Sequence, residues 1–257
     1  MNRRPCGKSQ SPSDSVHCAV DGSRNEGEAG GAKRRGEPSP KRSWGLLREE
    51  LFRWRPELTA DQWWEGENRF FRCLGSVLVQ RTTWQNARRA IGRLRERGLT
   101  DPNAVLQASD EELAAAVRPA GFYRSKVPAI REVCRLFLRV RDGAENASDL
   151  RGRLLQIRGI GPETADTILL YVFDRPAFVG DAYAERIASR WFGEALTREK
   201  IREEVLREIQ DPVQLQLLHA HLVELGKEFC RKRAPRCPEC PLRVTCHLGS
   251  GGVGFLP

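Results

Sequence analysis

Apolar residues recur at helical spacing along almost the whole chain beyond residue 43, and this pattern constrains the fold more than any other feature. Apolar residues three and four positions apart line one face of a helix. The clearest stripes are Leu47, Leu51 and Trp54, then Phe70, Leu74, Val77 and Leu78, then Ile130, Val133, Cys134, Phe137 and Leu138, and then Ala165, Ile168, Leu169 and Val172. No segment shows the sustained alternation of a half-buried strand. The sequence therefore predicts an all-α fold.

Residues 1–43 have a different composition. They are rich in Gly, Pro and Ser, and their only larger apolar residues are Met1, Val16 and Val20. Such a segment cannot bury a core, so we expect a disordered basic tail over residues 1–43. The whole chain holds 43 Lys and Arg against 34 Asp and Glu, a net charge of +9. This balance favours a polyanion, such as a nucleic acid, as partner.

The sequence contains no membrane-spanning pattern. Its longest strongly apolar run, Ile168 to Phe173, is far shorter than the roughly 20 residues that cross a bilayer, and the first residues lack the apolar core of a signal peptide. We therefore expect no membrane partner and a cytoplasmic location, with association to the nucleoid through DNA.

A short turn with two glycines lies between two helical stripes. Glycine permits a positive φ and a close approach to a ligand, and Pro162 suits the first turn of the following helix. The open N–H groups of that turn would face a phosphate. The residues that we expect to contact DNA here are Arg158, Gly159, Ile160 and Gly161. Taken alone, this turn fits an ordinary helix–helix connection equally well.

The segment Leu154–Ala165, followed by Phe178–Tyr183, resembles the helix-hairpin-helix region of the endonuclease III superfamily of DNA glycosylases. The resemblance implies that Asp181 is the catalytic carboxylate. A carboxylate suits this chemistry because cleavage of an N-glycosidic bond builds positive charge on the sugar, which the carboxylate stabilises while it activates water. A helix cap is the alternative role for an Asp in this position.

Four cysteines near the C-terminus have the spacing of the 4Fe-4S cluster in the same superfamily. They are Cys230, Cys237, Cys240 and Cys246. Four thiolates can hold one such cluster. A zinc ion is the alternative, but zinc sites usually have two close cysteine pairs, and here Cys237 and Cys240 form the single pair.

Members of the superfamily that also cut the DNA strand carry a lysine just after the hairpin, and this chain has Glu163 there. A carboxylate cannot form the imine of the lyase reaction, so the resemblance implies a monofunctional enzyme with Glu163 as a second catalytic carboxylate beside Asp181.

Three stretches, 75–84, 117–126 and 159–166, resemble the 3-methyladenine glycosylase branch. In that branch the matching positions imply a base pocket lined by Trp63, Trp64 and Trp84, and Gln80 filling the gap left by the flipped base. Indole faces attract a cationic alkylated base by roughly 0.5–2 kcal/mol.

The resemblance implies a helix-hairpin-helix DNA glycosylase fold with a six-helix barrel over residues 61–175 and an iron–sulfur cluster domain from residues 44–60 and 176–250. We expect a monomer that flips a damaged base from double-stranded DNA and hydrolyses its N-glycosidic bond, with alkylated purines as substrates. One alternative is an endonuclease III-like glycosylase and AP lyase acting on oxidised pyrimidines, with another lysine such as Lys126 as nucleophile. A second alternative is a non-catalytic DNA-binding relative.

Overall fold

The structure is a computed structural model that describes residues 41–140 and 146–252, and every regular element within them is helical. This confirms the all-α prediction. The elements are α1 Trp44–Trp54, α2 Ala60–Trp63, α3 Arg69–Leu78, α4 Trp84–Glu96, α5 Pro102–Gln107, α6 Asp110–Val117, η1 Arg118–Ala120, α7 Tyr123–Arg139, α8 Ala147–Gln156, α9 Pro162–Tyr171, α10 Ala182–Phe192, α11 Arg198–Glu208, α12 Pro212–Glu228 and η2 Cys237–Glu239. None of the helices within the described ranges is long and apolar enough to cross a membrane.

Most of the predicted tail lies outside the described residues. Its last three residues, 41–43, are described, and Arg42 and Ser43 make contacts with the helical part of the chain. The Nε of Arg42 donates to the carbonyl of Thr245 at 2.8 Å, and the hydroxyl of Ser43 accepts from the N–H of Leu46 and so caps α1. These contacts tie Arg42 and Ser43 to the helical part of the chain.

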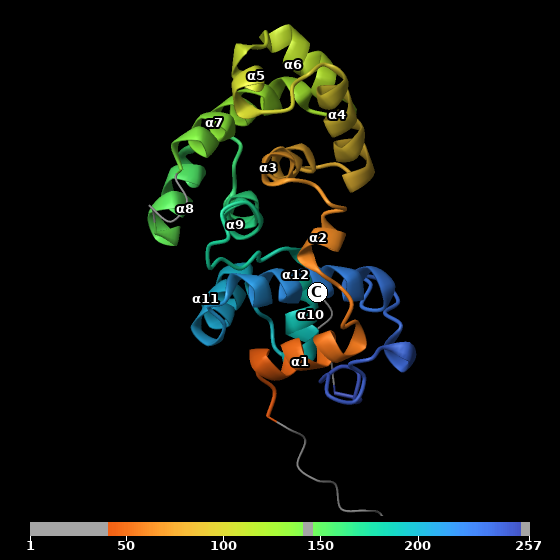
Figure 1. Cartoon of the computed structure of the whole chain (residues 1–257). Helices are drawn as coiled ribbons and strands as arrows, with labels where there is room; N and C mark the ends of the chain where they lie inside the picture. Colours follow the sequence, from red (N-terminus) through yellow and green to blue (C-terminus); the bar gives the residue numbers. More distant parts are fainter. Residues whose placement is uncertain (1–40, 141–145, 253–257) are drawn as a thin grey trace, which may run out of the picture. The chain divides into compact units, whose positions relative to one another are not determined.

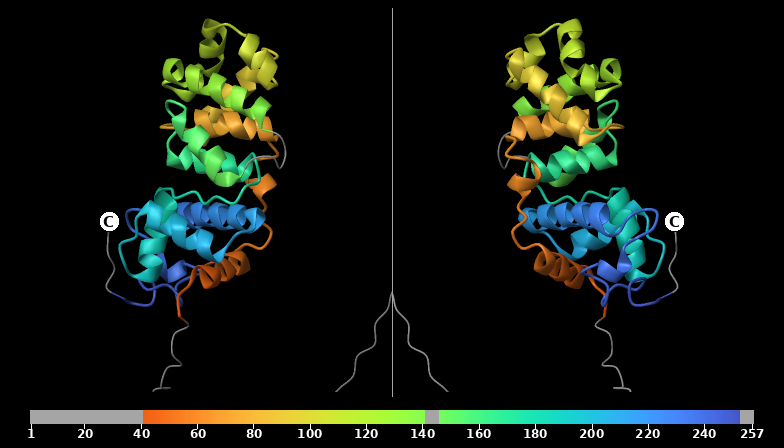
Figure 2. Two further views of the ribbon diagram at one scale, coloured as in Figure 1. Left: turned by 90° about the vertical axis from the view of Figure 1, so that its left-hand side faces the viewer. Right: turned by 90° about the vertical axis from the view of Figure 1, so that its right-hand side faces the viewer.

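The helices pack in two groups, which Figures 1 and 2 show on opposite sides of α12. In one group α3 contacts α4, α7 and α9, while α5 and α6 lie against α7 and α8 against α9. In the other group α1, α10 and α11 contact one another or α12. Helix α12 also contacts α2 and α9 and so joins the groups. The described residues belong to one compact unit, so the division into a barrel domain and a cluster domain stays a prediction.

Local sequence signals explain where the helices begin and end. The hydroxyl of Ser109 accepts from the N–H of Glu112 at 3.1 Å and caps the start of α6. Gly98, with φ +69°, follows the end of α4, and Pro162 is the first residue of α9. Such signals can be predicted from the sequence because a capping residue lies within three residues of the helix terminus that it caps.

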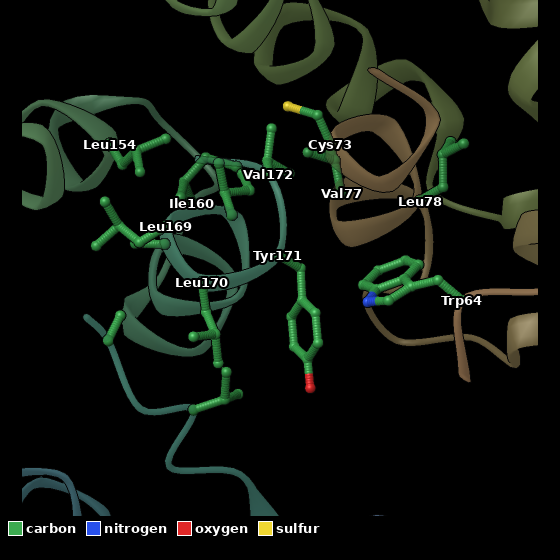
Figure 3. Close-up of a cluster of buried hydrophobic side chains, with 14 of the residues drawn as sticks. Trp64, Cys73, Val77, Leu78, Leu154, Ile160, Leu169, Leu170, Tyr171 and Val172 are labelled. Atoms are coloured by element: carbon green, nitrogen blue, oxygen red, sulfur yellow. The ribbon is translucent and has the colours of Figure 1, made fainter. Parts of the chain in front are cut away.

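The core is built from the predicted stripes. Leu74, Val77 and Leu78 of α3 are fully buried against α9, where Ile168 and Leu169 are buried too. Figure 3 shows part of this cluster, with Tyr171 and Trp64 at its edge. Burying one such aliphatic side chain contributes about 1.5–3 kcal/mol. On α7 the predicted buried stripe is wrong at its last residue, because Leu138 is half exposed.

Candidate active site

The predicted hairpin connects α8 to α9 over residues 157–161. Gly159 has φ +93°, which requires glycine, whereas Gly161 has φ −93° and lies in extended backbone that any residue adopts. A Cβ on Gly161 would meet nothing within 4 Å, and no side chain caps α9. The second glycine therefore leaves the first-turn N–H groups of α9 uncovered, as a phosphate contact requires.

The other hairpin residues divide between surface and core. Arg158 is exposed, but Ile160 is 5% exposed and its N–H donates to the carbonyl of Ile157. The Ile160 side chain therefore anchors the hairpin in the core (Figure 3), and a DNA contact at this residue stays a prediction. The predicted gap-filling residue Gln80 reaches the same turn, because its Nε2 donates to the carbonyl of Gly159 at 3.0 Å and to the hydroxyl of Thr164 at 2.8 Å.

Asp181 precedes α10 and is 9% exposed. Its Oδ1 accepts from the N–H groups of Tyr183 at 2.9 Å and Ala184 at 2.7 Å. The capping role that the sequence left open is therefore present, and it occupies one carboxylate oxygen. The second oxygen, Oδ2, faces His219 of α12, whose Nε2 lies 3.7 Å away. Asp181 can thus cap its helix and still offer a charged oxygen to a substrate.

The balance of forces on Asp181 favours the carboxylate. Burial raises its pKa, but the contacts with His219 and the two N–H groups of α10 outweigh burial, so the pKa lies below the ordinary value of 3.8. The charged form is the one that stabilises a sugar cation or activates water.

Glu163 lies in the first turn of α9, with 57% of its side chain exposed. Its Oε2 pairs with Arg198 at 3.3 Å, and Arg198 pairs with Glu185 at 2.9 Å. Desolvation and the negative charge of Asp181 raise the pKa of Glu163, which places the two predicted catalytic carboxyls in one electrostatic neighbourhood.

Arg198 also packs closely against Gly180, the residue before the carboxylate. A Cβ on Gly180 would lie 2.8 Å from the backbone oxygen of Arg198 and 3.1 Å from its Cβ. Glycine at position 180 therefore lets the start of α11 pack directly against the segment that carries Asp181.

The three tryptophans of the predicted base pocket contact one another. The rings of Trp63 and Trp64 are 5.6 Å apart and those of Trp64 and Trp84 are 5.4 Å apart, both edge to face. Tyr171 joins them by stacking on Trp63 at 5.4 Å, with an interplanar angle of 27°. Trp64 is 4% exposed and so packs in the core, while Trp63 and Trp84 are half-buried. Of the three rings, those of Trp63 and Trp84 are therefore the ones that solvent reaches.

Lys126, the alternative nucleophile, is 4% exposed. Its Nζ donates to the carbonyls of Leu78, Gln80 and Ala120 at 2.7–3.0 Å. Burial lowers its pKa, yet all three ammonium protons have acceptors at the end of α3 and in η1. The lysine is therefore a structural cap and does not present a free amine to DNA.

The four clustered cysteines line a single pocket together with Arg190. The Nη1 of Arg190 donates to the Sγ of Cys230 at 3.4 Å, and backbone N–H groups hydrogen-bond to Cys240 and Cys246. Burial raises the pKa of Cys240 to about 11. In the described ranges no three His, Cys, Asp or Glu side chains are grouped as ligands of one metal ion. Donors that point at sulfur suit bound thiolates, so this residue set fits a cluster with four cysteine ligands.

Comparison with known proteins shows the family to which the chain belongs. Residues 74–213 match the HhH-GPD superfamily of base-excision DNA repair proteins. A protein of Methanocaldococcus jannaschii, named as a DNA repair glycosylase, is 36% identical over 197 residues, which cover 72% of this chain and 88% of that protein. Endonuclease III of Thermotoga maritima is 32% identical over 180 residues, which cover 69% of this chain and 83% of that enzyme.

Solved structures share the fold. Endonuclease III trapped as a covalent intermediate with DNA superposes with a TM-score of 0.63 at 22% identity, covering 80% of this chain and 95% of that one. A 3-methyladenine DNA glycosylase of H. pylori superposes with a TM-score of 0.58 at 22% identity, covering 72% and 97%. The chain belongs to the HhH-GPD superfamily and is a DNA N-glycosylase of base-excision repair.

Sequence reasoning missed three residues near Asp181: His219, Tyr171 and Arg198. His219 is adjacent to the apolar stripe of α12, which includes Leu218 and Leu222, so a polar ring at the edge of a buried face was the available signal. The sequence did not indicate which side chain the ring meets, because Asp181 precedes a different helix, α10.

Proposed function

We propose that the protein releases alkylated purine bases from double-stranded DNA by hydrolysis and leaves the abasic strand uncut. The observation that carries this proposal is the pair of carboxyl groups, Asp181 and Glu163, with a carboxyl at the position after the hairpin where a lyase would need an amine. Asp181 faces His219, and the ring of His219 meets Trp63. The proposed base pocket uses Trp63 and Trp84 as stacking surfaces and the carboxylates as partners for a positively charged base.

The chemistry asked of the protein is modest. A purine that carries a positive charge is already a good leaving group, so the site must mainly select the cation and stabilise the sugar. Flipping the base costs a few kcal/mol, and stacking contributes about 1–3 kcal/mol per base. The buried carboxylate of Asp181 supplies the negative charge beside the sugar, where water is scarce and the interaction is strong.

The lyase alternative lacks a nucleophile in the described part of the site. Glu163 cannot form an imine, and Lys126 is held by three carbonyl oxygens. Borohydride reduction tests this directly, because it traps an imine between protein and DNA. We expect no trapped complex with damaged duplex DNA. A covalent adduct would favour the bifunctional enzyme on oxidised pyrimidines.

We propose that Cys230, Cys237, Cys240 and Cys246 hold a 4Fe-4S cluster. The support is the donor set: four cysteines that line one pocket, with Arg190 and backbone N–H groups directed at their sulfurs. A cluster ligated on all four irons supplies structural support and charge near the DNA, while hydrolysis is left to the carboxylates.

The decisive experiment incubates the purified protein with methylated duplex DNA and identifies the released bases by chromatography. The same strands are then examined for breaks before and after alkali. Release of 3-methyladenine or 7-methylguanine with breaks only after alkali is the expected result. Release of no alkylated base would refute the substrate class, and breaks without alkali would refute the monofunctional reaction.

The Asp181→Asn variant is the matched control. The amide keeps the shape and one oxygen for the α10 cap but loses the charge, so we expect base release to fall by about 10²–10⁴-fold while binding to DNA is retained. Full release by this variant would refute the role of Asp181.

DNA binding has its own signature. We propose that a monomer binds in the cytoplasm to nucleoid DNA through the hairpin and Arg158. The association constant should fall with salt at a slope of about −0.9 per phosphate contacted. An affinity that does not change with salt would contradict phosphate contacts.

A further inference from the structure

Two buried groups beside Asp181 have no part in the chemistry described so far. His219 is 4% exposed and Tyr171 is fully buried. The Nδ1 of His219 lies 2.8 Å from the hydroxyl of Tyr171, and that hydroxyl lies 2.9 Å from the carbonyl oxygen of Gln216. The other ring nitrogen, Nε2, lies 3.7 Å from Oδ2 of Asp181 and has no hydrogen-bond partner among the described residues.

Counting protons shows what the ring presents to Asp181. The hydroxyl of Tyr171 has one proton, which it gives either to Nδ1 or to the carbonyl of Gln216. If it gives the proton to Nδ1, the neutral ring carries its own proton on Nε2. If the hydroxyl gives its proton to the carbonyl of Gln216, Nδ1 of His219 must donate its own proton to the hydroxyl oxygen. In a neutral ring Nε2 would then carry a lone pair that points at the buried carboxylate, which is unfavourable. Protonation of Nε2 removes this repulsion. Each favourable arrangement therefore directs an Nε2–H group at Asp181.

The contacts of His219 leave its ring little freedom. The ring of Trp63 meets it edge on at 5.3 Å, and Tyr171, which holds Nδ1, stacks on the same Trp63. The gap of 3.7 Å to Asp181 is longer than a hydrogen bond, and such contacts commonly shorten when substrate closes the site. The ring is thus oriented in advance toward a carboxylate oxygen that the helix cap leaves open.

Charged groups on every neighbouring element act on Asp181. Helix α9 contributes the negative charge of Glu163 and the hydroxyl of Tyr171, α11 contributes the positive charge of Arg198, and α12 contributes His219. On α10 itself, Glu185 acts mainly through its pair with Arg198. Burial is the largest effect on the pKa of Asp181 and raises it, while the contact with His219 is the largest opposing effect. Loss of His219 would leave the two N–H groups of α10 as the remaining contacts that oppose burial.

We infer that His219, with its ring fixed by Tyr171, is a positioning residue that holds Oδ2 of Asp181 in place and keeps the carboxylate charged when a bound base excludes water. The inference rests on the proposed function in one respect, that Asp181 acts on the glycosidic bond. The geometry between His219 and Asp181 stands independently of which base is released.

The first test does not depend on activity. The protonation of Asp181 is followed by carbon NMR of the full-length protein labelled at the aspartate carboxyl carbons, and the signal is assigned by its absence in Asp181→Asn. We expect His219→Phe to raise the carboxyl pKa by at least about one unit, which is about tenfold in the proton affinity. His219→Gln, which can offer an amide N–H, should restore part of the difference. An unchanged pKa in His219→Phe would overturn the inference.

The second test uses single-turnover base release across pH on the lesion that the wild-type protein releases. We expect the acid limb of the rate profile to move to higher pH in His219→Phe, by about the shift seen in the NMR titration, with DNA affinity unchanged. Tyr171→Phe should move the acid limb in the same direction but by less. In this variant the imidazole of His219 keeps its place, but Nδ1 loses the hydroxyl that fixes where the ring carries its proton. A fall in rate with an unmoved limb would show a merely structural role and refute the inference.

His221 provides the matched control on the same helix. It is also buried, but its Nδ1 and Nε2 face the carbonyls of Leu217 and Arg55 at 2.7 and 2.9 Å. His221→Gln should lower the melting temperature without moving the titration of Asp181. Should no base be released by the wild-type protein, the proposed function fails while the NMR comparison still decides the role of His219.

Discussion

The close contact at Gly180 gives a prediction whose size follows from the structure. In Gly180→Ala, the new Cβ would lie 2.8 Å from the backbone oxygen of Arg198, a distance that real Cβ atoms do not adopt. The backbone of Gly180 does not lie in the left-handed region, so the cost arises from this contact alone. Because the obstacle is the backbone of α11, the helix itself must move, and a side-chain rotation cannot relieve the clash.

Overpacking of this kind costs about 1–3 kcal/mol. For a folded region of about this size, that loss lowers the melting temperature by roughly 2–12 °C. The movement would also draw Arg198 away from Glu163, with which it pairs at 3.3 Å. We therefore expect slower base release in addition to lower stability, since Asp181 is the next residue.

Gly92→Ala is the matched control. Gly92 lies inside α4, and a Cβ there would meet nothing within 4 Å. Alanine favours a helix over glycine by about 0.5–1 kcal/mol, so this variant should be more stable than the wild-type protein. Urea unfolding followed by circular dichroism measures both variants. If Gly180→Ala unfolds at the same urea concentration as the wild-type protein, the packing argument for Gly180 is wrong.

Four further predictions follow from single contacts. Asp166→Asn should cost about 1.5–3 kcal/mol in urea unfolding, because Asp166 is 2% exposed and accepts two bonds from Arg151 at 2.7 and 3.1 Å. Lys126→Met should cost about 3 kcal/mol in the same assay, because it leaves three carbonyl oxygens without their donor, and equal stability would contradict the capping role. Cys237→Ala should lower the iron content of the purified protein below the about four atoms expected for an intact cluster, and an unchanged content would exclude Cys237 as a ligand. Folding lowers the pKa of Asp181, so the stability that its carboxylate contributes is complete well above pH 3.8 and is lost as the pH falls through the folded-state pKa. Between pH 5 and pH 3 the melting temperature of Asp181→Asn should therefore fall by less than that of the wild-type protein.

The fold was predictable because its signals are local. Stripes such as that of Leu74 and Val77 decide which face of a helix is buried, and caps such as Ser109 and Pro162 decide where a helix begins. The hairpin could be recognised for the same reason. Ile160 shows the limit: it stands between two exposed glycines, yet its side chain turns into the core, because packing between α8 and α9 decides its direction.

The candidate site was predictable only in part, since its residues come from helices far apart in the sequence. Asp181 precedes α10, Tyr171 lies on α9 and His219 lies on α12. No spacing along the sequence predicts that these three side chains are neighbours. The cysteines are the opposite case. Four within 17 positions of the chain line one pocket, because a short segment cannot place them far apart.

The position of Tyr171 connects two properties that the reaction needs at the same moment. Its ring stacks on Trp63, the proposed surface for the base, and its hydroxyl lies 2.8 Å from Nδ1 of His219, which faces Asp181. A base that displaces water around Trp63 would also remove solvent from the carboxylate of Asp181. The charge of Asp181 would then depend more strongly on the protein groups that contact it. His219 contacts Trp63 directly, so the proposed base pocket also contains the group that we propose keeps Asp181 charged. The packing of α9 against α12 would therefore account both for the exclusion of water from the proposed site and for the retained charge of Asp181.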